Sequence, residues 1–149
     1  MRMYVISIGL ALLVSVAVAA EKKIQMKDLP PTVLKTVQDQ TKGAEIHGIT
    51  SETEQGKLTY EVETMVNGKH RDITVDAKGV LAEVEEETTL DAIPPAAKAA
   101  FEKKAAGGKI AMVETVTRGS DTSYEATYTD KAGKKHEFAV TKDGAAAKD

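Results

Sequence analysis

The chain has 149 residues and a formal net charge of −3. It contains no cysteine, which excludes disulfides, thiolate metal sites, a cysteine nucleophile and a lipid-modified cysteine anchor. It also lacks tryptophan, has only two phenylalanines and shows no basic run with interleaved aromatic residues. This composition argues against nucleic-acid binding.

Residues 1–20 predict a signal peptide. Arg2 supplies a positive charge, the segment Tyr4–Val18 is apolar, and small residues follow up to Ala20. An uncleaved anchor is the alternative, but the apolar run falls short of the roughly 20 residues that span a membrane. We therefore expect cleavage near Ala20, and a domain of residues 21–149 that is periplasmic or secreted and has no membrane contact after cleavage.

One phrase occurs twice in the remaining chain. LPPTVLKTV begins at Leu29 and IPPAAKAAF begins at Ile93, an offset of 93 − 29 = 64. Glycines, prolines and apolar positions stay in phase between the two copies, which predicts two repeats at about 27–87 and 91–144. Further matching pairs are Tyr60-Glu61 with Tyr124-Glu125 and, after one inserted residue, Gly68-Lys69 with Gly133-Lys134.

Each copy of the phrase predicts a helix. Pro31 and Pro95 suit a first helical turn, where the missing N–H has no intrahelical partner. Gly43 and Gly107 are expected to end the two helices. The apolar positions that recur at helical spacing are Val33, Leu34 and Val37 in the first helix and Ala97, Ala100, Phe101 and Ala105 in the second.

After each helix the apolar period becomes two, which predicts antiparallel strands. The first repeat carries four strands, with a turn near Gln55-Gly56 and a strong hairpin signal at Asn67-Gly68. The second repeat carries strands at about 109–118, 122–130 and 134–142. The segment after Gly144 is too short for a confident fourth strand.

The predicted fold class is α+β. A unit of about 60 residues is marginally stable alone, so the two repeats should pair side by side. We expect one antiparallel sheet of seven or eight strands, with both helices on one face sealing a common core.

The pattern of Leu/Ile-Pro-Pro, amphipathic helix, glycine, Tyr-Glu strand and Gly-Lys hairpin resembles the PepSY-like family, also described as beta-lactamase-inhibitor-like. The resemblance covers roughly Lys27 to Gly144. It implies an exported bacterial binding module, related in fold to inhibitors that hold an enzyme with an exposed sheet face. The family carries no catalytic residues, so none is transferred. The chain lacks the cysteines of the disulfide-bearing beta-lactamase inhibitor protein, so inhibition of a beta-lactamase is not implied.

The face of the predicted sheet that the helices leave bare is the candidate site. It is wide and mostly polar, which suits either a protein or peptide partner or a simple solvated surface. No serine-hydrolase elbow, phosphate-binding glycine loop or zinc-protease helix occurs, so we expect no catalytic residues, no cofactor and no enzyme. The predicted partner-binding residues are Glu61, Glu63, Met65, Asp72, Glu125 and Thr127.

Two other groups of residues carry weaker signals. His70 and His136 lie near equivalent hairpins and, with Asp72 or Glu137, could bind a metal weakly, but solvated strand residues are the simpler interpretation, and no metal site is predicted. A run of carboxylates near the joint could attract a cation or basic partner, or could keep a strand soluble and prevent edge pairing. Its members are Glu83, Glu85, Glu86, Glu87 and Asp91.

Together these features predict a non-enzymatic periplasmic or secreted binding or inhibitory module, which engages an envelope protein or peptide through the exposed sheet face. The alternative is an envelope sensor or binding protein for a small ligand or metal ion.

Overall fold

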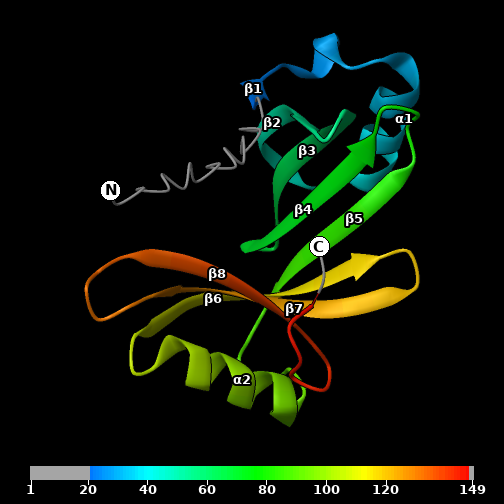
Figure 1. Ribbon diagram of the computed structural model, residues 1–149. Coiled ribbons are helices and arrows are strands. Elements are labelled where there is room, and N and C mark those ends of the chain that lie inside the picture. The colour runs from blue at the N-terminus through cyan, green and yellow to red at the C-terminus, as the bar shows by residue number, and fades with distance from the viewer. Residues whose placement is uncertain (1–20, 148–149) are drawn as a thin grey trace, which may run out of the picture.

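The computed structural model describes residues 21–147. The predicted signal peptide therefore lies outside the described residues. Within them, strands follow one another in chain order across a single open antiparallel sheet (Figure 1). The strands are β1 (Lys22–Lys23), β2 (Glu45–Glu54), β3 (Lys57–Val66), β4 (Lys69–Asp76), β5 (Leu81–Thr88), β6 (Lys109–Arg118), β7 (Asp121–Thr129) and β8 (Lys135–Thr141).

The predicted sheet is confirmed, but its eighth strand comes from the other end of the chain. The short strand β1 pairs with the outer edge of β2, through Lys22 opposite Ser51. After Gly144, the described residues make a single bridge, between Val140 and Ala146. A two-residue strand has no periodicity to detect, so β1 could not be predicted from the sequence.

Two hairpins close as the residue types predict. Gln55 and Gly56 have φ values of 49° and 77°, and Asn67 and Gly68 have values of 53° and 79°. Two consecutive left-handed residues match the twist of the flanking strands, and Asn-Gly adopts this turn readily. The turns therefore set the register of β2, β3 and β4.

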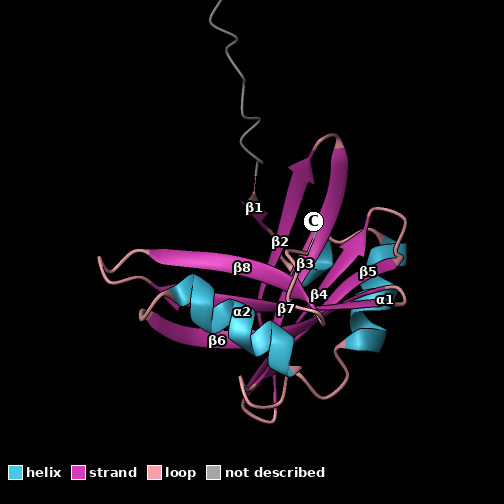
Figure 2. Cartoon of the chain, turned by 60° about the horizontal axis from the view of Figure 1, so that its bottom comes forward, coloured by secondary structure: helices cyan, strands magenta, loops and turns pink. Residues whose placement is uncertain are grey.

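Both helices lie on one face of the sheet, as predicted. Ile73 on β4 is buried beneath α1 (Pro31–Gln40) and pairs with Val84 on β5, which in turn pairs with Thr117 on β6. Val113 lies four residues before Thr117 on the same strand, hence on the same face, and packs in the core beneath α2 (Pro95–Ala105). Figure 2 shows α2 lying across β6, β7 and β8.

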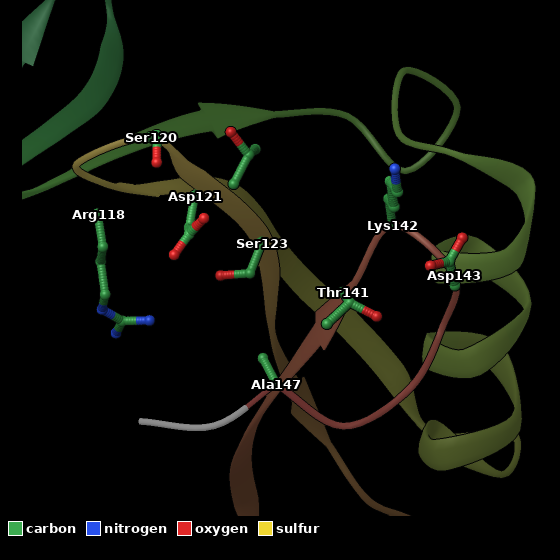
Figure 3. Close-up of a pocket in the computed structure, with 9 residues that line it drawn as sticks. Arg118, Ser120, Asp121, Ser123, Thr141, Lys142, Asp143 and Ala147 are labelled. Atoms are coloured by element: carbon green, nitrogen blue, oxygen red, sulfur yellow. The ribbon is translucent and has the colours of Figure 1, made fainter.

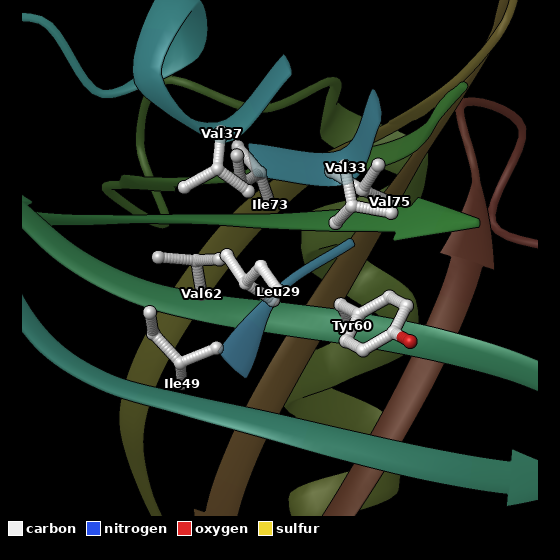
Figure 4. Close-up of a cluster of buried hydrophobic side chains, with 8 residues drawn as sticks. All are labelled: Leu29, Val33, Val37, Ile49, Tyr60, Val62, Ile73 and Val75. Atoms are coloured by element: carbon white, nitrogen blue, oxygen red, sulfur yellow. The ribbon is translucent and has the colours of Figure 1, made fainter. Parts of the chain in front are cut away.

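The expectation of one common core is wrong, because each helix closes a core of its own. The first cluster consists of Leu29, Val33, Val37, Ile49, Tyr60, Val62, Ile73 and Val75 (Figure 4). The second consists of Ile93, Ala97, Phe101, Val113, Ala126 and Val140.

The two clusters are separated by polar residues on the helix-covered face of β5 and β6. Glu86 pairs with Thr115 there, and Val84 pairs with Thr117. Arg71 reaches across this region, with Nε 3.3 Å from a Glu86 carboxylate oxygen and one terminal N–H group 3.1 Å from the carbonyl oxygen of Gln40. The Arg71–Glu86 ion pair and the neighbouring threonines therefore interrupt the apolar surface between the two helices.

In each of the two repeats, a glycine in a turn lies close to the backbone of the first turn of the helix. A Cβ added at Gly79 would lie 2.7 Å from the carbonyl oxygen of Thr32, and one at Gly144 would lie 2.6 Å from that of Ala96. Both glycines have positive φ, of 87° and 79°. Any side chain at either position therefore meets backbone as well as conformational strain.

We expect Gly79→Ala to lower the free energy of unfolding by about 2–4 kcal/mol, since it combines a left-handed backbone with a backbone clash. The matched control is Gly133→Ala, where φ is 85° but nothing lies within 4 Å of the added Cβ. That change should cost about 1 kcal/mol. Urea unfolding of both variants measures the difference, and equal losses would show that the contact with α1 is unimportant.

Candidate functional site

All six residues predicted from the sequence lie on the sheet face opposite the helices. On β3, Glu61, Glu63 and Met65 alternate with the residues that point to the helices. Asp72 precedes the buried Ile73 on β4. Glu125 and Thr127 flank the buried Ala126 on β7. The structure thus gives the six residues one common surface, while their role as a partner-binding site stays a prediction.

This face gathers carboxylates from three neighbouring strands. Asp72 on β4 pairs directly with Glu85 on β5, and Glu114 extends from β6. One carboxylate oxygen from each lies within 4.8 Å of the others. Strands β4 and β6 flank β5, so in a flat sheet their backbones would be about 10 Å apart. The side chains from both flanks therefore converge over β5, and we call Asp72, Glu85 and Glu114 the acidic triad.

The members of the triad differ in their hydrogen bonds. An Asp72 carboxylate oxygen accepts a hydrogen bond of 2.8 Å from the backbone N–H of Thr64. Glu114 is only 5% exposed, and among the described residues no fully buried side-chain nitrogen or oxygen lacks a hydrogen-bond partner. Glu85 is half-buried. The triad therefore crowds three carboxylates that are partly or largely removed from water, and this arrangement costs free energy when they are charged.

Burial and crowding change the acidity of these groups. The pKa of Glu85 is raised to about 8. Burial is the largest cause, and the neighbouring carboxylates Glu83 and Glu114 add to it. Burial, with Asp72 and Glu125, raises the pKa of Glu114 to about 7, although His70 partly opposes this. In both residues the protonated form is favoured because the charged form loses water and meets like charges.

The same effect extends along β3. Burial raises the pKa of Glu61 above its ordinary value, and the charges of Asp72 and Glu63 add to the shift. Several carboxylates of this face therefore hold protons more tightly than exposed carboxylates do. We call this surface, made by the triad together with Glu61, Glu63 and Glu125, the acidic face.

Flanking carboxylates already have partners. Glu83 forms an ion pair with Arg118 toward one end of β6. Glu87 accepts a hydrogen bond of 3.0 Å from the backbone N–H of His70. Beside the triad lies a hollow of about 270 Å³, lined by His47, Glu63, Thr64, His70, Asp72 and Met112. The triad is thus reachable from one side.

Two residues of the triad were not recognised as site residues from the sequence. Of the interpretations of the carboxylate run that contains Glu85, prevention of edge pairing is wrong, because β5 pairs with β4 and with β6 in the middle of the sheet. Glu114 alternates with the buried Val113, which was the available signal that it faces away from α2. Only the register between strands brings it close to Asp72.

The two histidines that the sequence places near equivalent hairpins lie on different strands. His70 lies on β4 and His136 lies on β8, with three strands between them. His136 Nε2 is 2.8 Å from an Asp130 carboxylate oxygen, and its ring stacks on Tyr128 at 5.1 Å between centroids. His136 therefore supports its own hairpin, and the two histidines form no joint metal site.

A second hollow, of about 640 Å³, lies between the β6–β7 hairpin and the segment after β8 (Figure 3). Arg118 and Lys142 contribute positive charge, while Asp121 and Asp143 contribute negative charge. The Arg118 guanidinium is already paired with Glu83. Because the charges of this lining are mixed, the hollow selects no ligand class, and the acidic face is the stronger candidate.

The chain can now be compared with known proteins. Residues 32–79, from α1 to the turn after β4, match the family described as PepSY, peptidase propeptide and YPEB domain. Over these residues the chain is similar to PepSY domains. No curated protein matches the sequence.

Solved structures share the fold of this PepSY-like chain. A protein from Bacteroides eggerthii with a provisional periplasmic assignment has a TM-score of 0.63 at 17% identity, covering 80% of this chain and 86% of that one. A DUF2874 family protein from Bacteroides ovatus has a TM-score of 0.60 at 18% identity, covering 80% and 85%. A BLIP-like protein from Bacteroides fragilis has a TM-score of 0.54 at 17% identity, covering 80% and 84%. These likenesses agree with the resemblance to beta-lactamase-inhibitor-like proteins and concern the fold.

The raised pKa values predict an unusual dependence of stability on pH. Glu85, at about 8, and Glu114, at about 7, hold protons more tightly when folded than when unfolded. Between about pH 5 and pH 8 the folded state therefore binds more protons, and stability falls as pH rises. We expect a loss on the order of 2 kcal/mol from pH 6 to pH 8.5, since solvent still screens part of the interaction.

Urea unfolding at both pH values tests this, with Glu114→Gln as the diagnostic variant. The neutral amide should raise stability at the higher pH and flatten the pH dependence. Glu137→Gln, an exposed carboxylate on β8, is the matched control and should leave the profile unchanged. Stability that increases from pH 6 to pH 8.5 in the unmodified protein would contradict the prediction.

Proposed function

We propose that this protein is a non-enzymatic binding or inhibitory module of the periplasm or the extracellular space, and that its acidic face engages a positively charged segment of a protein or peptide. The observation that carries the proposal is the convergence of carboxylates on a sheet face that neither helix covers. Both helices lie on the opposite side of the sheet, so the acidic face is available to a partner.

Charge complementarity favours a cationic partner. Glu85 and Glu114 are held in unfavourable electrostatic surroundings, shown by the upward displacement of the pKa of each. A lysine or arginine side chain placed among them would offset the like-charge repulsion and supply hydrogen-bond donors. Binding would then release unfavourable energy stored in the free protein, and the surrounding negative field would also accelerate association.

The comparisons support the non-catalytic and exported parts of the proposal. The PepSY match and the BLIP-like neighbour point to binding or inhibition rather than catalysis. The provisional periplasmic assignment of the Bacteroides eggerthii protein agrees with the signal-peptide pattern of residues 1–20. No helix among the described residues is both long and apolar enough to cross a membrane.

Site-specific photocrosslinking tests the docking surface. A photoreactive residue at Met65 or at Thr127 should capture a partner in the intact envelope, because both positions lie on the acidic face. The matched control is Lys103, an exposed position on α2. The yield of crosslinked adduct should fall at least tenfold at high salt and in the double variant Glu61→Arg and Glu125→Arg. The variant Glu102→Arg on α2 should leave the yield unchanged. Adducts of equal yield from Lys103, or none from the acidic face, would refute the proposal.

A further inference from the structure

The second repeat carries exposed lysines at one end, around the last turn of α2 and the turn between β7 and β8. Figures 1 and 2 both show these two segments at the same end of the repeat. We call this set the basic end. Its members are Lys103, Lys104, Lys109, Lys131, Lys134 and Lys135.

Strand register and side-chain contacts bring the basic end together. Lys109 on β6 and Lys135 on β8 lie opposite the same residue of β7, one on either side of it. Lys104 and Lys131 line one hollow of about 390 Å³. Lys104 Nζ also lies 4.7 Å from the centre of the Phe138 ring on β8. The lysines therefore form one patch, although three separate parts of the chain supply them.

The positive charge of the basic end is not neutralised within the described molecule. Among residues 21–147, no ion pair joins any of these six lysines to a carboxylate, whereas Lys35 and Lys98 lie 2.7 Å and 2.6 Å from aspartate oxygens. Asp130, at the β7–β8 turn, lies 2.8 Å from His136 Nε2 and accepts hydrogen bonds from backbone N–H groups of the turn. The basic end therefore presents its charge to other molecules.

The basic end lies too far from the acidic face of its own molecule to neutralise it. Glu125 lies opposite Ala139, which is four residues along β8 from Lys135. Four residues of a strand span about 13 Å. This separation exceeds the Debye length of about 8 Å at physiological salt, so attraction within one molecule is screened. The two charged surfaces can meet closely only between two copies of the chain.

The shape of the acidic face suits a projecting turn. His47 on β2 and Met112 on β6 line the same hollow of about 270 Å³, although β3, β4 and β5 lie between their strands. In a flat sheet these two strands would be about 19 Å apart. Val116, opposite Glu85 on this face, is only 1% exposed although both helices lie on the other side of the sheet. The sheet is therefore curled, and the acidic face is concave.

We propose that two copies of this protein associate, with the basic end of one copy on the acidic face of the other. The β7–β8 turn carries Lys131, Lys134 and Lys135 into the concave face, where their ammonium groups donate hydrogen bonds to the crowded carboxylates. The pairing rests on the proposed function in that it uses the same acidic face, and it names a second copy as an occupant of that face.

Sedimentation equilibrium of the complete protein as exported tests this pairing. Species larger than the monomer should form as the protein concentration rises. The dissociation constant should increase at least tenfold from about 0.05 M to about 0.5 M NaCl, because salt screens contacts between exposed charges. The triple variant Lys131→Glu, Lys134→Glu and Lys135→Glu should remain monomeric.

The matched control changes the net charge by the same amount in the first repeat. It reverses three exposed lysines outside the basic end and should associate like the unmodified protein. Its substitutions are Lys27→Glu, Lys57→Glu and Lys78→Glu. Equal loss of association in the control and in the triple variant would reduce the effect to net charge and overturn the proposal.

A charge swap separates loss of pairing from loss of folding. The double variant Glu61→Arg and Glu125→Arg should also be monomeric. Mixing it with the triple variant should restore association, because each variant then carries the charge that the other lacks. Monomers at every concentration of the unmodified protein, or no recovery on mixing variants that keep their melting temperatures, would refute the pairing.

The pairing and the proposed function fail separately. The triple variant keeps its acidic face, so a photoreactive residue at Met65 should still capture a different envelope protein. Capture of such a partner by a protein that stays monomeric would refute the pairing alone. Association of copies without capture of any other protein would refute the proposed function alone.

Discussion

The antiparallel ladder between β5 and β6 is the interaction on which the rest of the structure depends. The two apolar clusters share no residue, so neither core spans the two halves. The ladder that joins the halves runs from Val84 opposite Thr117 to Thr88 opposite Val113. By placing β6 beside β5 in this register, it puts both helices on the same face and sets Glu114 near Asp72 and Glu85.

The same ladder makes the candidate site electrostatically unfavourable. Central strands of a sheet bury part of each side chain, and three carboxylates on three central strands lose water while they repel one another. The Arg118–Glu83 ion pair compensates only one end of the acidic face. Natural proteins often accept lower stability where a binding site requires it. The crowded carboxylates in the middle of this sheet are an example of such a destabilising group. A positively charged ligand would relieve the repulsion among these carboxylates, and this relief would favour its binding.

Local residue chemistry was enough to predict much of the fold. Pro31 and Pro95 mark the helix starts, because proline is tolerated only in the first turn. Asn67-Gly68 predicts its hairpin because both residues adopt the left-handed conformation. Alternation in β3 predicts which side chains face away from α1, and so places Glu61 and Glu63 on the bare face. Each of these conclusions depends on a few neighbouring residues.

The predictions that were wrong concern contacts between residues far apart in the chain. The common core was expected from the marginal size of one repeat, yet Arg71 and Glu86 insert an ion pair between the two clusters. Edge protection was one interpretation of the carboxylate run around Glu85, and it is wrong because β6, which follows the second helix in the chain, pairs with β5 there.

The sequence by itself determined the two helices, the hairpins and the polarity of the uncovered sheet face, because proline, glycine and period-two alternation act through neighbouring backbone and side chains. Only the tertiary structure decided that Asp72, Glu85 and Glu114 meet, because their oxygens converge through strand register and side-chain direction across β4, β5 and β6, which no spacing along the chain encodes.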